Sequence, residues 1–150
     1  MPDDVATIAR TDAGLASSLR VSLMRLSRRL RHERGPAADD LSVHHLAVLA
    51  TLWRGGELSI GELAAAEKVQ PPSMTRTVNA LAERGLVNRR ARPDDGRVVV
   101  VDLTEAALKV LDASRRSKEA WLNRQLAELT PAERQTLREA APILDRLSHA

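Results

Sequence analysis

Hydrophobic residues recur at steps of three and four along much of this chain, which is the spacing of amphipathic helices. The first such run predicts a helix over residues 12–34, with Thr11 or Asp12 as its cap. Its apolar stripe consists of Leu15, Leu19, Leu23, Leu26 and Leu30. A second helix is expected over residues 42–53, capped by Ser42. Its apolar side is formed by Leu46, Leu49, Ala50 and Trp53.

Two longer helical runs close the chain. Thr104 is placed to cap a helix that reaches about Leu129, and its apolar positions are Leu108, Leu111, Trp121, Leu122 and Leu126. The polar stretch 114–119 in its middle is expected to be exposed or to lie in a solvated groove. The sequence Thr-Pro-Ala-Glu at 130–133 is a capping box with proline at the first helical position. It predicts a last helix whose apolar side is Leu137, Ala141, Leu144 and Leu147.

Two short helices are expected between these runs. Ser59 and Glu62 form a capping box, because each side chain can satisfy a backbone N–H of the other residue. Pro71 suits the first turn of the next helix, where its missing N–H has no helical partner to lose. Gly85 ends that helix, since glycine readily takes the left-handed conformation of a C-terminal cap.

The second short helix has two distinct faces. At 100° per residue, Met74, Val78, Leu81 and Ala82 fall on one side. The opposite side carries Ser73, Arg76, Asn79 and Glu83. Hydroxyl, guanidinium and amide groups are the types that read base edges in the major groove of DNA.

After Gly85 the pattern changes to that of β-strands. Residues 86–92 and 98–101 are extended segments, and Pro-Asp-Asp-Gly-Arg at 93–97 is typical of a tight hairpin. Arginines decorate this hairpin at positions 89, 90, 92 and 97. A helix-turn-helix followed by a basic β-hairpin predicts a winged helix.

Three segments of this region resemble the DNA-binding core of the MarR family of bacterial transcriptional regulators. They are SIGELA at 59–64, VQPPSMTRTVNALAERGLVNR at 69–89 and RPDDGRVVVVDLT at 92–104. One helix before and two after this core also fit the family, although Gln70 stands where the family often has Ser, and Gln is a poor N-cap.

The resemblance implies a mainly α fold with a small β-hairpin wing, in one domain over residues 1–150. A winged helix-turn-helix core at about 42–103 would be flanked by dimerisation helices at about 12–34 and 104–148. An edge strand at 57–58 is implied as well. The aliphatic stripes of the terminal helices support a homodimer independently, because an isolated stripe needs a covering surface.

The function implied is sequence-specific binding of double-stranded DNA by a transcriptional regulator, with repression as the family default. A two-fold dimer would bind a pseudo-palindromic operator with half-site centres ~10 bp apart. The residues expected to contact DNA are Ser73, Thr75, Arg76, Asn79, Arg90, Arg92 and Arg97. Arg76 is the candidate for a bidentate guanine contact, with phosphate as the alternative. Arg97 is expected in a minor groove and Arg92 on phosphate, while Arg90 is left open and Asp94 and Asp95 are expected to fix the turn.

The resemblance also implies a small aromatic or phenolic effector, bound between the dimerisation helices and the winged core. Arg25, His44 and Trp53 are the candidate residues that line this site, although core packing explains Trp53 equally well. No metal and no cofactor are expected. Adjacent His44 and His45 point about 100° apart on a helix and cannot grip one metal together.

Composition narrows the alternatives. The chain has 150 residues, a net charge of +3 and no cysteine, which excludes disulfides and thiol-based redox sensing within it. No apolar run reaches ~18 residues, so we expect no membrane partner, and an N-terminal stretch without a signal-peptide pattern favours the cytoplasm. No motif of a hydrolase, metalloprotease or nucleotide-binding enzyme is present. Two alternatives stay open, a metal-responsive regulator of the same fold and a winged-helix module for protein–protein contact.

Overall fold

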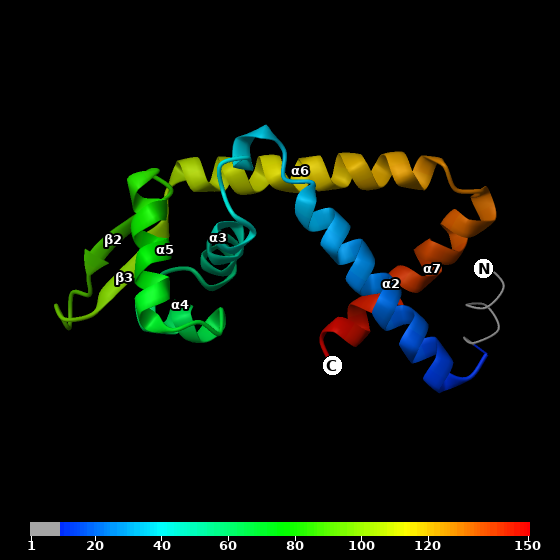
Figure 1. The fold of residues 1–150 in the computed structure, drawn as a ribbon, viewed down its shortest axis with the longest axis horizontal. Coiled ribbons are helices and arrows are strands. Elements are labelled where there is room, and N and C mark those ends of the chain that lie inside the picture. The colour runs from blue at the N-terminus through cyan, green and yellow to red at the C-terminus, as the bar shows by residue number, and fades with distance from the viewer. Residues whose placement is uncertain (1–9) are drawn as a thin grey trace.

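The computed structural model describes residues 10–150 and shows a mainly helical chain with a small sheet (Figure 1). The helices are α2 (Asp12–His32), the 3₁₀ turn η1 (Pro36–Ala38), α3 (Val43–Gly55), α4 (Ile60–Ala66), α5 (Pro71–Glu83), α6 (Glu105–Ala127) and α7 (Pro131–Ser148). The strands are β1 (Leu58–Ser59), β2 (Val87–Ala91) and β3 (Val99–Leu103). The predicted fold class is therefore confirmed. No helix among residues 10–150 is long and apolar enough to span a membrane.

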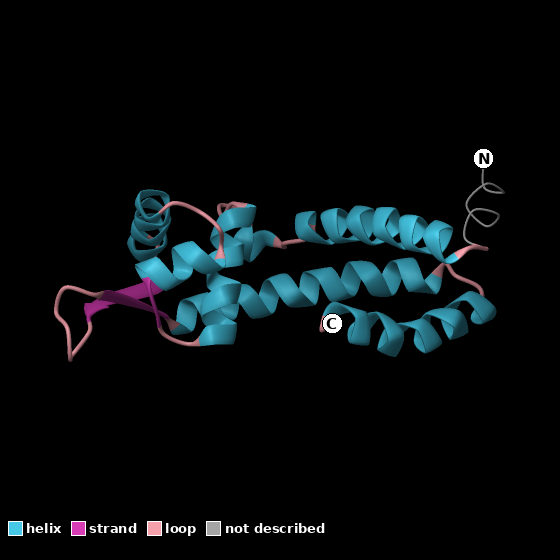
Figure 2. Cartoon of the chain, turned by 90° about the horizontal axis from the view of Figure 1, so that it is seen from below, coloured by secondary structure: helices cyan, strands magenta, loops and turns pink. Residues whose placement is uncertain are grey.

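Helix α6 runs along the length of the molecule and joins two lobes (Figure 1). At one end, α3, α4, α5 and the three strands gather around the first turns of α6, and we call this part the winged lobe. At the other end, α2 leads obliquely away from the middle of α6 and α7 folds back from its far end, so that the two cross in the view of Figure 1, while Figure 2 shows them on either side of α6. We call this second part the helical lobe.

The hydrophobic core lies in the winged lobe. Its largest fully buried side chains are Val48, Leu49, Leu52, Leu63, Met74, Val78, Leu81, Val100 and Val101. In the helical lobe, by contrast, α2 buries only Gly14 and α7 buries no residue. The winged lobe thus supplies a rigid support for whatever its outer surface binds.

Local capping chemistry fixes the helix starts where the sequence predicts them. The Ser59 hydroxyl accepts from the Glu62 N–H at 3.1 Å, and the Glu62 carboxylate accepts from the Ser59 N–H at 2.7 Å. Thr11 and Thr104 accept from the third residue beyond them, and Thr130 forms the predicted box with Glu133. These helix starts are therefore fixed by residues within one turn of each cap.

One capping box was not predicted. Ser42 caps α3 as expected, but His45 completes the box, since its Nδ1 accepts from the Ser42 N–H at 3.3 Å. Partial burial, followed by the charges of Arg84 and His44, holds the pKa of His45 below its ordinary value. The neutral ring is the form that this acceptor role requires.

The three strands form an antiparallel sheet in the order β1-β3-β2. The edge strand implied by the family resemblance is present, one residue later than expected, with Leu58 opposite Val101. The predicted hairpin is confirmed, because Ala91 lies opposite Val99 and the Arg92 N–H donates to the Val98 carbonyl at 2.8 Å, which leaves residues 93–97 as the connection. Asp95 stabilises this connection as predicted, since its carboxylate accepts from the Arg97 N–H at 3.1 Å.

Two expectations need correction. The stretch 114–119 was expected to be exposed or to lie in a groove, and it lines grooves beside α6, but Ser114 is more buried than expected, at 3% exposed, because α6 presents it to the space between α2 and α3. Trp53 was placed on the apolar side of α3, yet it is 66% exposed, since it lies near the helix end beyond the core.

Candidate nucleic-acid interface

Helices α4 and α5 form the helix-turn-helix. They pack against each other, and the turn between them places Lys68 in the left-handed conformation at φ 54°. Helix α5 begins at Pro71 without a side-chain cap, as expected for Gln70. Met74, Val78 and Leu81 anchor α5 with no exposed surface, so the opposite side of the helix faces outward.

The outward side of α5 carries the predicted residues. Ser73, Thr75 and Arg76 are exposed, and Asn79 is half-buried. The Thr75 hydroxyl donates to the Pro71 carbonyl at 3.0 Å, so only its oxygen lone pairs remain for a partner. Arg76 makes no hydrogen bond or ion pair within residues 10–150, and all of its N–H groups are free to contact a ligand.

The arginines of the wing divide between two environments. Arg90 pairs with Glu57 and lies 3.7 Å from Asp102, and Arg92 lies 3.8 Å from Glu62. Their positive charge is therefore partly compensated by carboxylates of the winged lobe. Arg97 makes no ion pair among the residues that the structure describes, and it lies in the loop at the tip of the hairpin.

Arg89 was not among the predicted contact residues. It donates to the Oδ1 atom of Asn79 on α5, and it makes no ion pair in the described part of the chain. The strand pattern of the sequence places Arg89 and Arg90 on opposite faces, and the structure shows that Arg89 shares the face of the buried Val87. Arg90 points to the other face, which explains why it meets Glu57 instead.

A groove of about 340 Å³ lies between α2, α3 and α6. Most of its lining is aliphatic, and the buried Ser114 hydroxyl has no hydrogen-bond partner there. The lining residues are Leu30, Leu46, Ala50, Leu111, Ser114, Arg115, Lys118, Glu119 and Leu122. This arrangement suits a small apolar molecule that carries one polar group.

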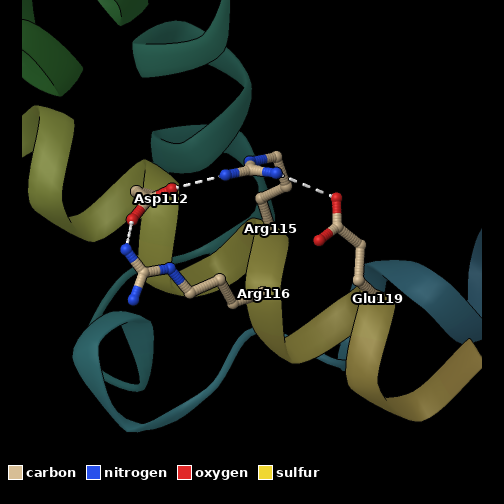
Figure 3. Close-up of polar contacts among 4 residues, drawn as sticks. All are labelled: Asp112, Arg115, Arg116 and Glu119. Carbon is tan, nitrogen blue, oxygen red and sulfur yellow. Dashed lines mark hydrogen bonds and ion pairs between the residues drawn. The ribbon is translucent and has the colours of Figure 1, made fainter. Parts of the chain in front are cut away.

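A second groove of about 650 Å³ shares Ala50, Leu111 and Arg115 with the first and extends to the exposed Trp53. Arg115 is held at their common edge, because it donates to Asp112 at 2.7 Å and to Glu119 at 3.0 Å (Figure 3). The hydrogen bond from Arg115 holds the pKa of Asp112 below its ordinary value.

The candidate effector residues are thus separated. Trp53 lines the second groove, whereas Arg25 and His44 line neither of the two. Nor does any group of three or more His, Cys, Asp or Glu side chains within residues 10–150 lie close enough to hold a metal ion.

Comparisons with known proteins agree with this architecture. The sequence profile of the MarR family matches residues 41–99. An HTH-type transcriptional regulator of Mycobacterium tuberculosis is 43% identical over 89% of this chain and 92% of its own length. The HTH-type transcriptional repressor MdtR of Bacillus subtilis is 28% identical over 91% of this chain and 87% of its own length.

Among solved structures, a transcriptional regulator protein from Pseudomonas aeruginosa superimposes with a TM-score of 0.80. It is 34% identical to this chain, and the alignment covers 94% of this chain and 98% of that protein. The similarity therefore includes the helical lobe as well as the winged lobe.

Proposed function

Since this chain belongs to the MarR family and is an HTH-type transcriptional regulator rather than an enzyme, we propose that it represses transcription as a homodimer on a pseudo-palindromic operator. We propose further that a small molecule releases it from that operator. The observation that carries the DNA-binding part is the outward face of α5, where Arg76 is exposed and makes no ion pair or hydrogen bond among the described residues.

In this proposal α5 enters the major groove and the wing follows the neighbouring backbone. Arg76 has five N–H donors in a planar fork, which matches the O6 and N7 acceptors of guanine. Arg97 at the wing tip suits a narrow minor groove, whose negative potential attracts arginine. The partly compensated charges of Arg90 and Arg92 support weaker phosphate contacts.

The exposed apolar surface of the helical lobe supports the homodimer. Leu147 is 60% exposed, Met24 59% and Ile143 49% in the single chain. A two-fold axis through this lobe would cover the surface of both copies at once, because each copy presents the same patch to the other. The two α5 helices would then reach major-groove segments about one helical turn apart.

Repression is supported by one of the relatives, since MdtR of Bacillus subtilis is an HTH-type transcriptional repressor. The groove between α2, α3 and α6 supports release by an effector. A buried hydroxyl without a partner costs roughly 1–3 kcal/mol, which a ligand that hydrogen-bonds Ser114 would recover. A small aromatic ring with a phenol or carboxylate fits, since the ring would contact the aliphatic lining and Arg115 or Lys118 the anion.

The test is to select operator DNA from sheared genomic DNA with the full-length protein and to measure its affinity in shift assays. Arg97→Ala should weaken binding and lower the salt slope by about one, because one counterion-releasing contact is lost. Arg116→Ala on α6 is the control, since its guanidinium is paired with Asp112 away from α5. Failure to enrich any sequence would favour the protein–protein module instead.

A further inference from the structure

Asn79 and Arg89 form a contact that joins the two elements expected to approach DNA. Asn79 lies on α5 and Arg89 on β2, and a guanidinium N–H of Arg89 donates to the Oδ1 atom of Asn79. The Nδ2 amide nitrogen of Asn79 has no partner within residues 10–150. Within the pair the Asn79 oxygen is thus bound to Arg89, while the Asn79 NH₂ group is free to donate to another molecule.

The turn after α5 holds the two residues in register. Gly85 adopts φ 68°, and the Leu86 N–H donates to the Leu81 carbonyl at 2.9 Å, which closes the end of the helix. The Thr104 hydroxyl donates to the Gly85 carbonyl at 2.7 Å, and the Thr104 N–H donates to the Leu86 carbonyl at 3.1 Å. Strand β2 consequently runs back along α5 and brings Arg89 beside Asn79.

The chemistry of arginine fixes the orientation of the amide. A guanidinium has only donors, so the amide must turn its oxygen toward Arg89 and its NH₂ group away. A free asparagine reads adenine with both ends of the amide, because its oxygen accepts from N6 and its nitrogen donates to N7. The amide oxygen has two lone pairs, and with Arg89 on one of them, an N6 amino group on the other would bring its hydrogens close to the positive guanidinium.

We propose that Asn79 and Arg89 act as a donor-only pair, which presents its N–H groups to hydrogen-bond acceptors of DNA and disfavours the reading of adenine by Asn79. The proposal rests on the proposed function, since it takes α5 as the helix that enters the major groove. The acceptors are either the N7 and O6 atoms of guanine or the phosphate oxygens, because both are matched by an amide NH₂ beside a guanidinium.

The surroundings of the pair favour acceptors as well. Arg89 makes no ion pair in the described chain, whereas Arg90 and Arg92 on the same hairpin both face carboxylates. Arg76, one helical turn before Asn79, adds further unpaired N–H donors. This part of the interface thus concentrates donors and positive charge on one side of α5.

The experiment selects binding sites from randomised duplexes with the full-length wild type and four variants. Arg89→Ala frees the amide oxygen, and Asn79→Ala removes the amide altogether. Asn79→Asp keeps an acceptor for Arg89 but has no donor, so it loses the DNA contact without disturbing the turn. Arg90→Ala is the matched control, because it removes the same charge from the opposite face of β2. Thermal unfolding confirms that each variant is folded.

We expect Arg89→Ala to acquire a preference of about fivefold or more for adenine at the base pair that Asn79 faces. Arg90→Ala should keep the wild-type base preference. If Asn79→Ala and Asn79→Asp lose a guanine preference at one position per half-site, the acceptor is a base. If both weaken binding equally on all sequences, the acceptor is phosphate, and either result supports the donor-only pair.

A wild-type preference for adenine that Asn79→Ala abolishes would overturn the proposal, and so would identical base preferences for Arg89→Ala and Arg90→Ala. A wild type that selects no sequence would refute the proposed function and this inference with it. The two failures are distinguishable, because the first leaves a well-defined operator and the second leaves none.

Discussion

The winged lobe and the helical lobe bury their apolar side chains in different ways. In the winged lobe Leu49, Leu63 and Met74 have no exposed surface, although the lobe also carries the polar face of α5. In the helical lobe α7 has no buried residue, and Ile143 and Leu147 are about half exposed or more, at 49% and 60%. The difference indicates that the winged lobe is stabilised from within one chain, while the helical lobe leaves an apolar surface uncovered, which is the surface that the proposed homodimer would cover.

The largest expected effect tests the internal core. Leu49→Ala should lower the free energy of unfolding by about 2–5 kcal/mol, because it removes a fully buried side chain and leaves a cavity. Chemical denaturation at two protein concentrations measures it. The loss should be equal at both concentrations if the winged lobe depends on its own core. A loss below about 1 kcal/mol would contradict the contrast between the lobes.

A charge in the helical lobe should act on assembly. Leu147→Asp places a carboxylate on the exposed apolar side of α7, so dimerisation should weaken by about tenfold or more. Analytical ultracentrifugation over a concentration series measures the change. Arg138→Asp, an exposed polar position on the same helix, serves as the control for charge alone. Unchanged assembly in Leu147→Asp would show that a different surface forms the dimer.

A change on the outer face of α5 should leave both lobes folded and affect only DNA. Arg76→Ala should cost ~1–3 kcal/mol on the operator and relax the preference at one base position per half-site. The measurement is a shift assay on operator variants at several salt concentrations. Loss that is uniform across sequences would assign Arg76 to phosphate instead of guanine.

The smallest expected effect is a loss of stability at low pH, caused by the His45 cap of α3 in the winged lobe. The pKa of His45 is lowered in the folded chain. Its contribution to the free energy of unfolding is therefore fully present above about pH 6.5, the ordinary pKa, and is lost as the pH falls through the lowered pKa of the folded chain. Unfolding experiments between pH 8 and pH 5 should show a loss of about 0.5–1 kcal/mol, the low end for a helix cap.

His45→Glu provides the control for that pH effect. Glutamate completes the same kind of box as Glu62 and Glu133, whose pKa values are lowered by hydrogen bonds from Ser59 and Thr130. The variant should therefore keep its stability down to about pH 4.5 and lose it only below. An equal loss near pH 6 in both proteins would remove His45 as the cause.

Most of the fold could be predicted because its signals are local. Ser59 with Glu62 and Thr130 with Glu133 define helix starts within four residues, and Gly85 ends α5 in the same way. The two faces of α5 also follow from its period alone, since Met74 and Val78 are buried as expected. The helix caps and the two faces of α5 depend only on residues that are close together in the sequence, so they can be predicted from it.

The remainder depends on neighbours across space. Trp53 is apolar by type but lies beyond the edge of the core, and Ser114 is polar by type but faces a groove between helices. Whether Arg89 or Arg90 meets α5 is decided by how β2 packs in the lobe, since Arg89 lies on the same face of the strand as the buried Val87 and donates to Asn79, while Arg90 meets Glu57. The alternation of a strand places the two arginines on opposite faces, but it does not tell which of the two faces is turned toward α5.

Thr104 joins the end of α5 to the start of α6, the helix that continues into the helical lobe, through a single hydroxyl group. It donates to the Gly85 carbonyl behind α5 and accepts from the Ala107 N–H at the start of α6. The 23 residues of α6 rise about 34 Å, and the N-terminal end of the helix is attached directly behind α5. A tilt of about 10° at this attachment would displace the far end of α6 by about 6 Å, by the same geometry. In the proposed dimer, small changes beside the first turns of α6 would therefore be magnified into the spacing between the two α5 helices.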